Sequence, residues 1–168
     1  MAKLRHIALS VPDPWKTAEF YKHAFDLEVV GETDSSLAEG VFLSDGVINV
    51  ALLHFKSDEA AQGLGRDHVG LHHFGVWVDD IAEARRRVEA AGGEWLMGEP
   101  AEKGGSFYEV KFRDPDGVVF DLSESGWGGA QKNPGAAGNE TGRSRPLVSR
   151  FAERRAAAAQ AMAARTRK

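Results

Sequence analysis

Two stretches of the chain follow the same pattern, in which a strand is followed at once by a helix. Residues 5–11 (Arg-His-Ile-Ala-Leu-Ser-Val) and residues 70–80 (Gly-Leu-His-His-Phe-Gly-Val-Trp-Val-Asp-Asp) both show the period of two that is typical of a β-strand. His6 and His73 stand at the same point of the two copies, 67 residues apart. This spacing indicates an internal repeat, so the fold must be built from two similar modules.

A helix is predicted directly after each of these strands. Asp13 can cap the first helical turn and Pro14 suits the first helical position, so residues 15–25 are expected to be helical. In the second copy Asp80 is followed three residues later by Glu83, which is the spacing of a capping box. The two copies therefore share a helix as well as a strand.

Three more strands are expected after each helix, separated by short turns. In the first copy they are predicted at residues 27–31, 40–44 and 47–55. In the second copy they are predicted at residues 94–97, 106–112 and 118–123. Strands that recur between helices indicate an α/β or α+β protein, with helices that cover one face of mixed sheets.

The repeat and the charge divide the chain into four parts. We predict a first module at residues 1–56, a linker at 57–69, a second module at 70–125 and a tail at 126–168. Residues 1–125 hold 12 Lys and Arg against 23 Asp and Glu, a net charge of −11, whereas the tail holds 9 against 2, a net charge of +7. The acidic body argues against nucleic-acid binding by the folded modules.

The tail has the composition of a flexible segment. It is rich in Gly, Asn and Pro as far as Pro146, and rich in Ala and Arg beyond it. We therefore expect a flexible linker followed by a stretch that can form a C-terminal helix, and we expect the body to fold and act without it.

The composition limits the chemistry that the chain can support. It contains no cysteine, so a bound metal must be held by His, carboxylate or amide groups. The hydrophobic content of 42% suits a packed core, and no apolar run approaches the roughly 18 residues of a membrane span. We expect a cytoplasmic protein with no membrane partner.

The element order and two short motifs resemble the vicinal oxygen chelate superfamily. The motifs are residues 114–117 (Asp-Pro-Asp-Gly) before the last strand, and residues 20–22 (Phe-Tyr-Lys) ahead of residues 27–30 (Leu-Glu-Val-Val). The superfamily includes glyoxalase I, methylmalonyl-CoA epimerase, extradiol dioxygenases and bleomycin-binding proteins. The resemblance covers residues 3–125. It implies an α+β fold of two tandem βαβββ modules that form a cupped, barrel-like mixed sheet.

The resemblance also implies a divalent-metal site in the cup, with ligands from the first and last strands of each module. The matching positions are His6, Asn49, His73 and Asp121. Strand alternation agrees, because it places Asn49 and Asp121 on the face opposite their apolar neighbours. A carboxylate in an otherwise apolar strand is costly unless it meets a cation, which supports the assignment of Asp121.

Two positions depart from the pattern of the superfamily. Asn49 stands where the glyoxalase and epimerase branches have Glu or Gln, and Asp121 replaces the usual Glu. A shortened amide reaches less far, so Asn49 is at most a fourth ligand beside His6, His73 and Asp121. A two-His-one-carboxylate set favours Fe2+, with Mn2+, Zn2+ and Ni2+ as alternatives. We therefore expect a dioxygenase-like oxidoreductase that acts on a small molecule with adjacent oxygens.

Two other functions stay open at this point. One is a lyase or isomerase of the glyoxalase or epimerase type, and the other is a small-molecule binder of the resistance type that performs no chemistry. Tyr108 is an acid–base candidate by its chemistry alone, and Glu109 is a second catalytic candidate that either lines the cup or belongs to a solvated strand face.

Strand parity and sheet edges give two further expectations. Parity places His72 on the helix side of its strand, so we favour His73 over it as the ligand. Each module exposes a sheet edge, and pairing of modules within one chain or between two chains closes it, so we expect a homodimer.

Overall fold

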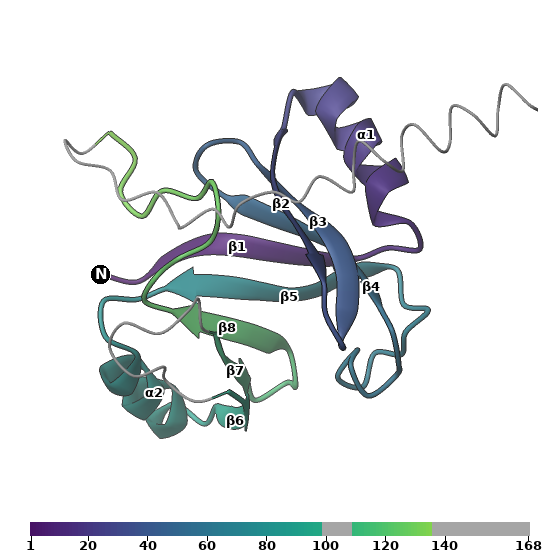
Figure 1. The fold of residues 1–168 in the computed structure, drawn as a ribbon. Helices are drawn as coiled ribbons and strands as arrows, with labels where there is room; N and C mark the ends of the chain where they lie inside the picture. Colours follow the sequence, from purple (N-terminus) through teal and green to yellow (C-terminus); the bar gives the residue numbers. More distant parts are fainter. Residues whose placement is uncertain (99–108, 136–168) are drawn as a thin grey trace, which may run out of the picture.

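The structure, a computed structural model, describes residues 1–98 and 109–135 (Figure 1). In chain order its elements are β1 (Lys3–Ser10), α1 (Pro14–Phe25), β2 (Glu28–Asp34), β3 (Ala38–Ser44), β4 (Asn49–Phe55), β5 (Gly70–Trp77), α2 (Ile81–Ala90), β6 (Glu94–Met97), β7 (Val110–Arg113) and β8 (Val119–Ser123). The order strand, helix, three strands occurs twice, so the predicted tandem βαβββ modules and the α+β class are confirmed.

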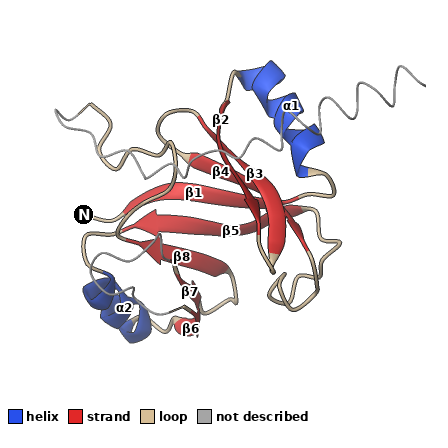
Figure 2. Ribbon diagram, in the orientation of Figure 1, coloured by secondary structure: helices blue, strands red, loops and turns tan. Residues whose placement is uncertain are grey.

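The strands form one curled mixed sheet in the order β2-β3-β4-β1-β5-β8-β7-β6 (Figure 2). Within each module the first strand pairs in parallel with the last, β1 with β4 and β5 with β8. The two modules meet where β1 pairs with β5 in the antiparallel sense. The modules thus join within one chain, so closing their edges needs no second copy. The homodimer stays a prediction, which light scattering would test.

Each helix begins at the aspartate that the sequence indicated and packs on its own half of the sheet. Asp13 accepts hydrogen bonds from the backbone N–H groups of Trp15 and Lys16, and Asp80 accepts one from that of Glu83. Trp15 and Ala18 of α1 pack against Val41, Leu43 and Leu52. Ile81 of α2 packs in a second cluster with Val110, Phe112, Phe120 and Leu122. Neither helix of the described residues is long and apolar enough to cross a membrane.

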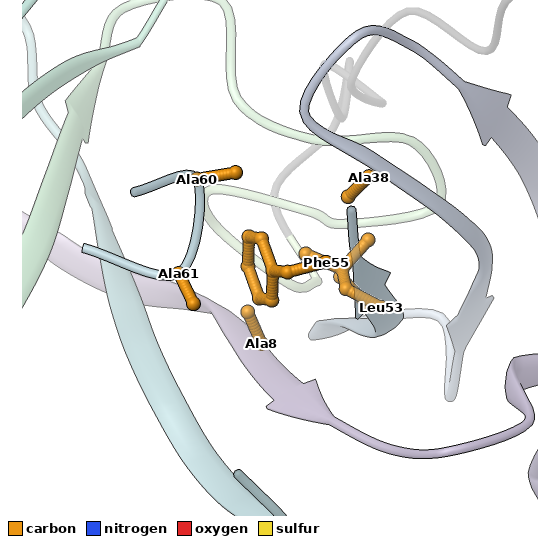
Figure 3. Close-up of a cluster of buried hydrophobic side chains, with 7 residues drawn as sticks. Ala8, Ala38, Leu53, Phe55, Ala60 and Ala61 are labelled. Carbon is orange, nitrogen blue, oxygen red and sulfur yellow. The ribbon is translucent and has the colours of Figure 1, made fainter. Parts of the chain in front are cut away.

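The face of β1 and β4 that turns away from α1 carries a third cluster, which includes Ala8, Ala51 and Phe55 (Figure 3). Alternation explains this placement, since Leu9 and Leu52 between them face α1. Buried Ala60 and Ala61 complete the cluster, and both belong to the segment that connects the modules. The predicted linker therefore also packs against the sheet and contributes to the hydrophobic core.

A β-bulge in β5 changes the direction that parity predicts for His72. Ala8 pairs with His73 and Leu9 pairs with Leu71, so His72 is the extra residue of this strand. Its ring stacks on Phe55, with 4.2 Å between ring centroids, on the face away from the helices. The expectation that His72 lies on the helix side is wrong, because alternation does not continue through a bulge.

The last described segment also differs from its prediction. Residues 126–135 were expected to begin a flexible tail, yet Trp127 is 3% exposed and Ala130 is fully buried, both packed with Trp77. A buried indole contributes much apolar contact, which explains why this stretch is held against the sheet. Residues 106–108 of the predicted strand and the tail beyond residue 135 lie outside the described residues.

Candidate metal centre

The four residues expected in the cup lie on the four central strands of the sheet. His6 of β1 pairs with Asn49 of β4, and His73 of β5 pairs with Ala8, two residues along β1 from His6. Asp121 of β8 pairs with Gly75 of β5. All four side chains are buried, with exposed fractions of 2% for His6, 1% for Asn49, 4% for His73 and none for Asp121.

Three of the four side chains bring one ligand atom each to a common point. The Nε2 atoms of His6 and His73 are 3.4 Å apart, and Nε2 of His73 is 3.3 Å from Oδ2 of Asp121. All three atoms lie within 4.8 Å of one another. Adjacent ligands of an ion with bonds of about 2.1 Å are separated by roughly 3.0–3.4 Å, so two of these distances already match a metal site.

Asn49 fixes the orientation of the His6 ring. The amide nitrogen of Asn49 donates to the carbonyl oxygen of Gly128 at 2.8 Å, so its Oδ1 is turned toward His6. Nδ1 of His6 lies 2.8 Å from this oxygen and donates to it. The hydrogen of a neutral His6 therefore sits on Nδ1, and Nε2 presents a lone pair to the site. Asn49 is engaged in orienting His6, which leaves the ligation to the other three residues.

His72 fixes the orientation of the His73 ring in a similar way. Nε2 of His72 donates to the carbonyl oxygen of Ala61 at 3.1 Å, so Nδ1 of His72 carries a lone pair. This nitrogen lies 2.8 Å from Nδ1 of His73 and accepts its hydrogen. Nε2 of His73 therefore also presents a lone pair. Each ligand is thus oriented through a neighbour that bonds to a backbone carbonyl, as is common for metal-binding histidines.

The site is consequently a group of three acceptors that share no hydrogen among themselves, and Oδ2 of Asp121 accepts one from Lys111. Burial lowers the pKa of His6 to about 4 and holds the pKa of His73 well below its usual value, in the latter case helped by the charge of Lys111. Both rings are neutral near pH 7, the form that binds metals. Oδ1 of Asp121 is buried and has no hydrogen-bond partner among the described residues. These residues fit a divalent cation, which would satisfy all of these atoms.

Lys111 is the one cation that touches this group in the described part of the chain. Its ammonium donates to Oδ2 of Asp121 at 2.6 Å and lies 3.4 Å from Oε2 of Glu109. Burial opposes its charge, but the carboxylates of Glu109 and Asp121 outweigh burial and raise the pKa of Lys111. With neutral histidines, the formal charge of the site is −1, and a divalent ion would bring it to +1.

A family model described as the Glyoxalase/Bleomycin resistance protein/Dioxygenase superfamily matches residues 3–122. The chain belongs to this superfamily. Among solved structures, a variant of Streptomyces coelicolor methylmalonyl-CoA epimerase in complex with 2-nitronate-propionyl-CoA aligns with a TM-score of 0.60 and 21% identity, over 71% of this chain and 94% of that one. Methylmalonyl-CoA epimerase from Mycobacterium tuberculosis aligns with the same TM-score and 18% identity, over 71% and 85% of the two chains. These similarities show the fold.

Two curated superfamily relatives come from Arabidopsis thaliana. "Probable lactoylglutathione lyase, chloroplastic" is 29% identical over 130 residues, which is 74% of this chain and 36% of that protein. "Lactoylglutathione lyase GLX1" is 26% identical over 126 residues, 72% and 44% of the two chains. The chain thus spans less than half the length of these relatives. The relatives named here are lyases and epimerases, so the comparisons favour the alternative that the sequence left open over its dioxygenase interpretation.

Trp127 lies next to the site but outside the superfamily match, and the sequence interpretation missed it. Its ring stacks on His6, with centroids 4.9 Å apart and planes 8° from parallel, and its N–H donates to Oε1 of Glu109 at 2.6 Å. The sequence held one signal, because a large aromatic residue among the glycines 126, 128 and 129 is more typical of a packed segment than of a flexible linker. Of the two placements left open for Glu109, the structure has the one beside the site, and its catalytic role stays a prediction. Tyr108 falls outside the described residues.

Proposed function

We propose that this superfamily member is a divalent-metal-dependent lyase or isomerase that moves a proton on the carbon next to a carbonyl group. One observation carries the proposal, namely the convergence of His6, His73 and Asp121 as three buried acceptors with fixed orientation. The names of the relatives supply the substrate class. Lactoylglutathione and methylmalonyl-CoA are both thioesters with a second oxygen-bearing group on the neighbouring carbon, so each offers two adjacent oxygens.

In this proposal His6, His73 and Asp121 hold the ion, which when bound acts as a Lewis acid on the substrate carbonyl. The donor set suits Zn2+, Ni2+, Mn2+ or Fe2+, and only oxygen chemistry would need Fe2+. The near-complete burial of the three ligands lowers the local dielectric constant, which strengthens electrostatic interactions there.

Glu109 is the proposed proton acceptor. Trp127 binds its Oε1, so Oε2, which receives only the long 3.4 Å hydrogen bond from Lys111, is the oxygen placed to take a proton from the substrate carbon. The ammonium of Lys111, 3.4 Å from this oxygen, adds positive charge where the enolate of the substrate would form. The formal charge of +1 that a divalent ion would give the site suits the negative charge that develops on the substrate oxygen.

The proposal is tested by proton exchange in D2O. We expect the metal-loaded protein to incorporate deuterium at the carbon next to the carbonyl of lactoylglutathione or methylmalonyl-CoA, as read by mass spectrometry. Glu109→Gln should lose the exchange and keep the metal, whereas Asp121→Asn should lose both. Glu28→Gln, on the exposed end of β2, is the matched control and should behave as wild type. Bound metal without exchange on either thioester would contradict the proposal.

A dioxygenase is the second candidate, and one observation favours it. Because Asn49 is engaged by His6 and Gly128, the site keeps the three-ligand set that Fe2+ oxygenases use. O2 uptake by the Fe2+-loaded protein with catechols, without thioester exchange, would establish this reading. A protein that binds these small molecules but no metal would be the non-catalytic binder.

A further inference from the structure

We propose that Trp127 is a positioning residue of the metal site, whose ring holds the His6 imidazole and whose indole N–H holds the Glu109 carboxylate. The role of Glu109 rests on the proposed function, whereas the role at His6 needs only a metal site. Trp127 lies beyond the residues 3–122 that the family model matches, so the superfamily does not assign it. It belongs to a segment that we call the strap, residues 126–132.

The strap fixes His6 in two ways. The Trp127 ring covers one face of the imidazole at 4.9 Å between centroids, nearly parallel. The carbonyl oxygen of Gly128, the next residue, accepts the hydrogen bond from Asn49, whose own oxygen binds Nδ1 of His6. Trp127 therefore contacts one face of the ring, and Gly128 fixes the Nδ1 edge of the ring through Asn49. A ring held this way keeps Nε2 aimed at the site without a bound ion.

The sheet is shaped to receive the indole. A Cβ at Gly75 would lie 2.5 Å from Cζ2 of Trp127 and 2.8 Å from Cβ of His6, so only glycine leaves space for both rings. The strap is anchored on both sides of Trp127. Gly126 packs so closely on the ring of Trp77 that a Cβ added at this glycine would lie 2.3 Å from the ring. The hydroxyl of Ser44 donates to the carbonyl oxygen of Gly129 at 2.9 Å. Trp127 is thus seated by several independent contacts.

The two contacts of Trp127 predict two separable effects. Stacking on His6 bears on metal affinity, and the N–H bond to Oε1 of Glu109 bears on proton transfer, because it fixes the orientation of the carboxylate. Phenylalanine keeps a flat ring and lacks the N–H group. Leucine lacks both.

The effect on metal affinity is tested by calorimetric titration of the full chain with Co2+ and no substrate. We expect Trp127→Leu to weaken Co2+ binding by about tenfold, the lower end for residues that orient metal ligands, and Trp127→Phe to stay close to wild type. Gly75→Ala keeps Trp127 in the sequence but crowds both its indole and Cβ of His6, so it should weaken Co2+ binding at least as much as Trp127→Leu. Trp95→Phe, on a half-exposed tryptophan of β6, is the matched control. Co2+ binding at wild-type strength in both Trp127→Leu and Gly75→Ala, or none in wild type, would overturn the proposal.

The effect on proton transfer is measured with the deuterium-exchange assay. Trp127→Phe should lower the exchange rate by about tenfold at saturating substrate with little change in KM, and it should lower the rate much less in a Glu109→Asp background, which keeps a weakened carboxylate base. Additive losses would overturn the link to Glu109. If wild type exchanges no deuterium while Trp127→Leu still loses Co2+, the proposed reaction fails and the positioning of His6 stands. The two failures are therefore distinguishable.

Discussion

Nε2 of His6 lies 3.4 Å from Nε2 of His73, and the hydrogen bonds on the far side of each ring make both nitrogens acceptors. Two lone pairs this close repel unless a proton or a metal ion lies between them. Burial lowers the pKa of both rings, so a proton is disfavoured near pH 7. The arrangement is therefore explained best by a bound cation.

His72→Phe should weaken divalent-metal binding by about tenfold without abolishing it, because the ring can still stack on Phe55 but no longer accepts the hydrogen of His73. Calorimetric titration with Zn2+ measures the effect. His54→Phe, at a half-exposed position of β4, is the control. Unchanged affinity in His72→Phe would show that the orientation of His73 does not depend on His72.

Lys111→Met should strengthen divalent-metal binding by about tenfold or more, since it removes a positive charge 2.6 Å from Oδ2 of Asp121. The same change should destabilise the metal-free protein by about 3 kcal/mol, because it leaves a buried carboxylate without its partner. Titration with Zn2+ and urea unfolding in EDTA give the two values. Weaker metal binding in this variant would mean that Lys111 helps to build the site.

The stability of the metal-free protein should fall as the pH is lowered from about 6.5 to about 4. In this window the unfolded chain protonates His6 and the folded chain does not, because burial lowers its folded pKa to about 4. Urea unfolding in EDTA at pH 7.5 and 4.5 should show a loss that is roughly 2–3 kcal/mol larger in wild type than in His6→Gln. Equal losses in the two proteins would show that His6 does not titrate in this way.

Truncation before the strap should destabilise the protein, whereas truncation after the strap should not. A chain that ends at Gly135 keeps Trp127 and should melt close to the full chain. A chain that ends at Ser125 loses a buried indole, worth about 3–5 kcal/mol, and should melt roughly 10–20 °C lower. This result would replace the expectation that everything after residue 125 is dispensable. Equal melting temperatures for the two chains would contradict the seating of the strap.

The sequence predicts the fold for a physical reason, since a period of two and paired caps repeat across the two copies. The resemblance to the superfamily singles out His6, His73 and Asp121, and alternation along the strands agrees with that choice. Counting fails at His72, because a bulge breaks the period.

Composition likewise cannot show which parts of a glycine-rich segment pack against the rest of the protein. The seat for Trp127 is made by Gly75, Trp77 and Ser44, which are distant in sequence. Long-range packing of this kind leaves only a weak local signal, a tryptophan among glycines, so the contacts of the strap could be found only in the structure.

The central claim is that His6, His73 and Asp121 hold one divalent ion. The most direct test is the metal content of the full chain after incubation with Zn2+ and gel filtration, measured by mass spectrometry for wild type and for His73→Ala. The account predicts one ion per chain in wild type and none in His73→Ala. A wild-type chain free of metal, or a His73→Ala chain that keeps its ion, would contradict it.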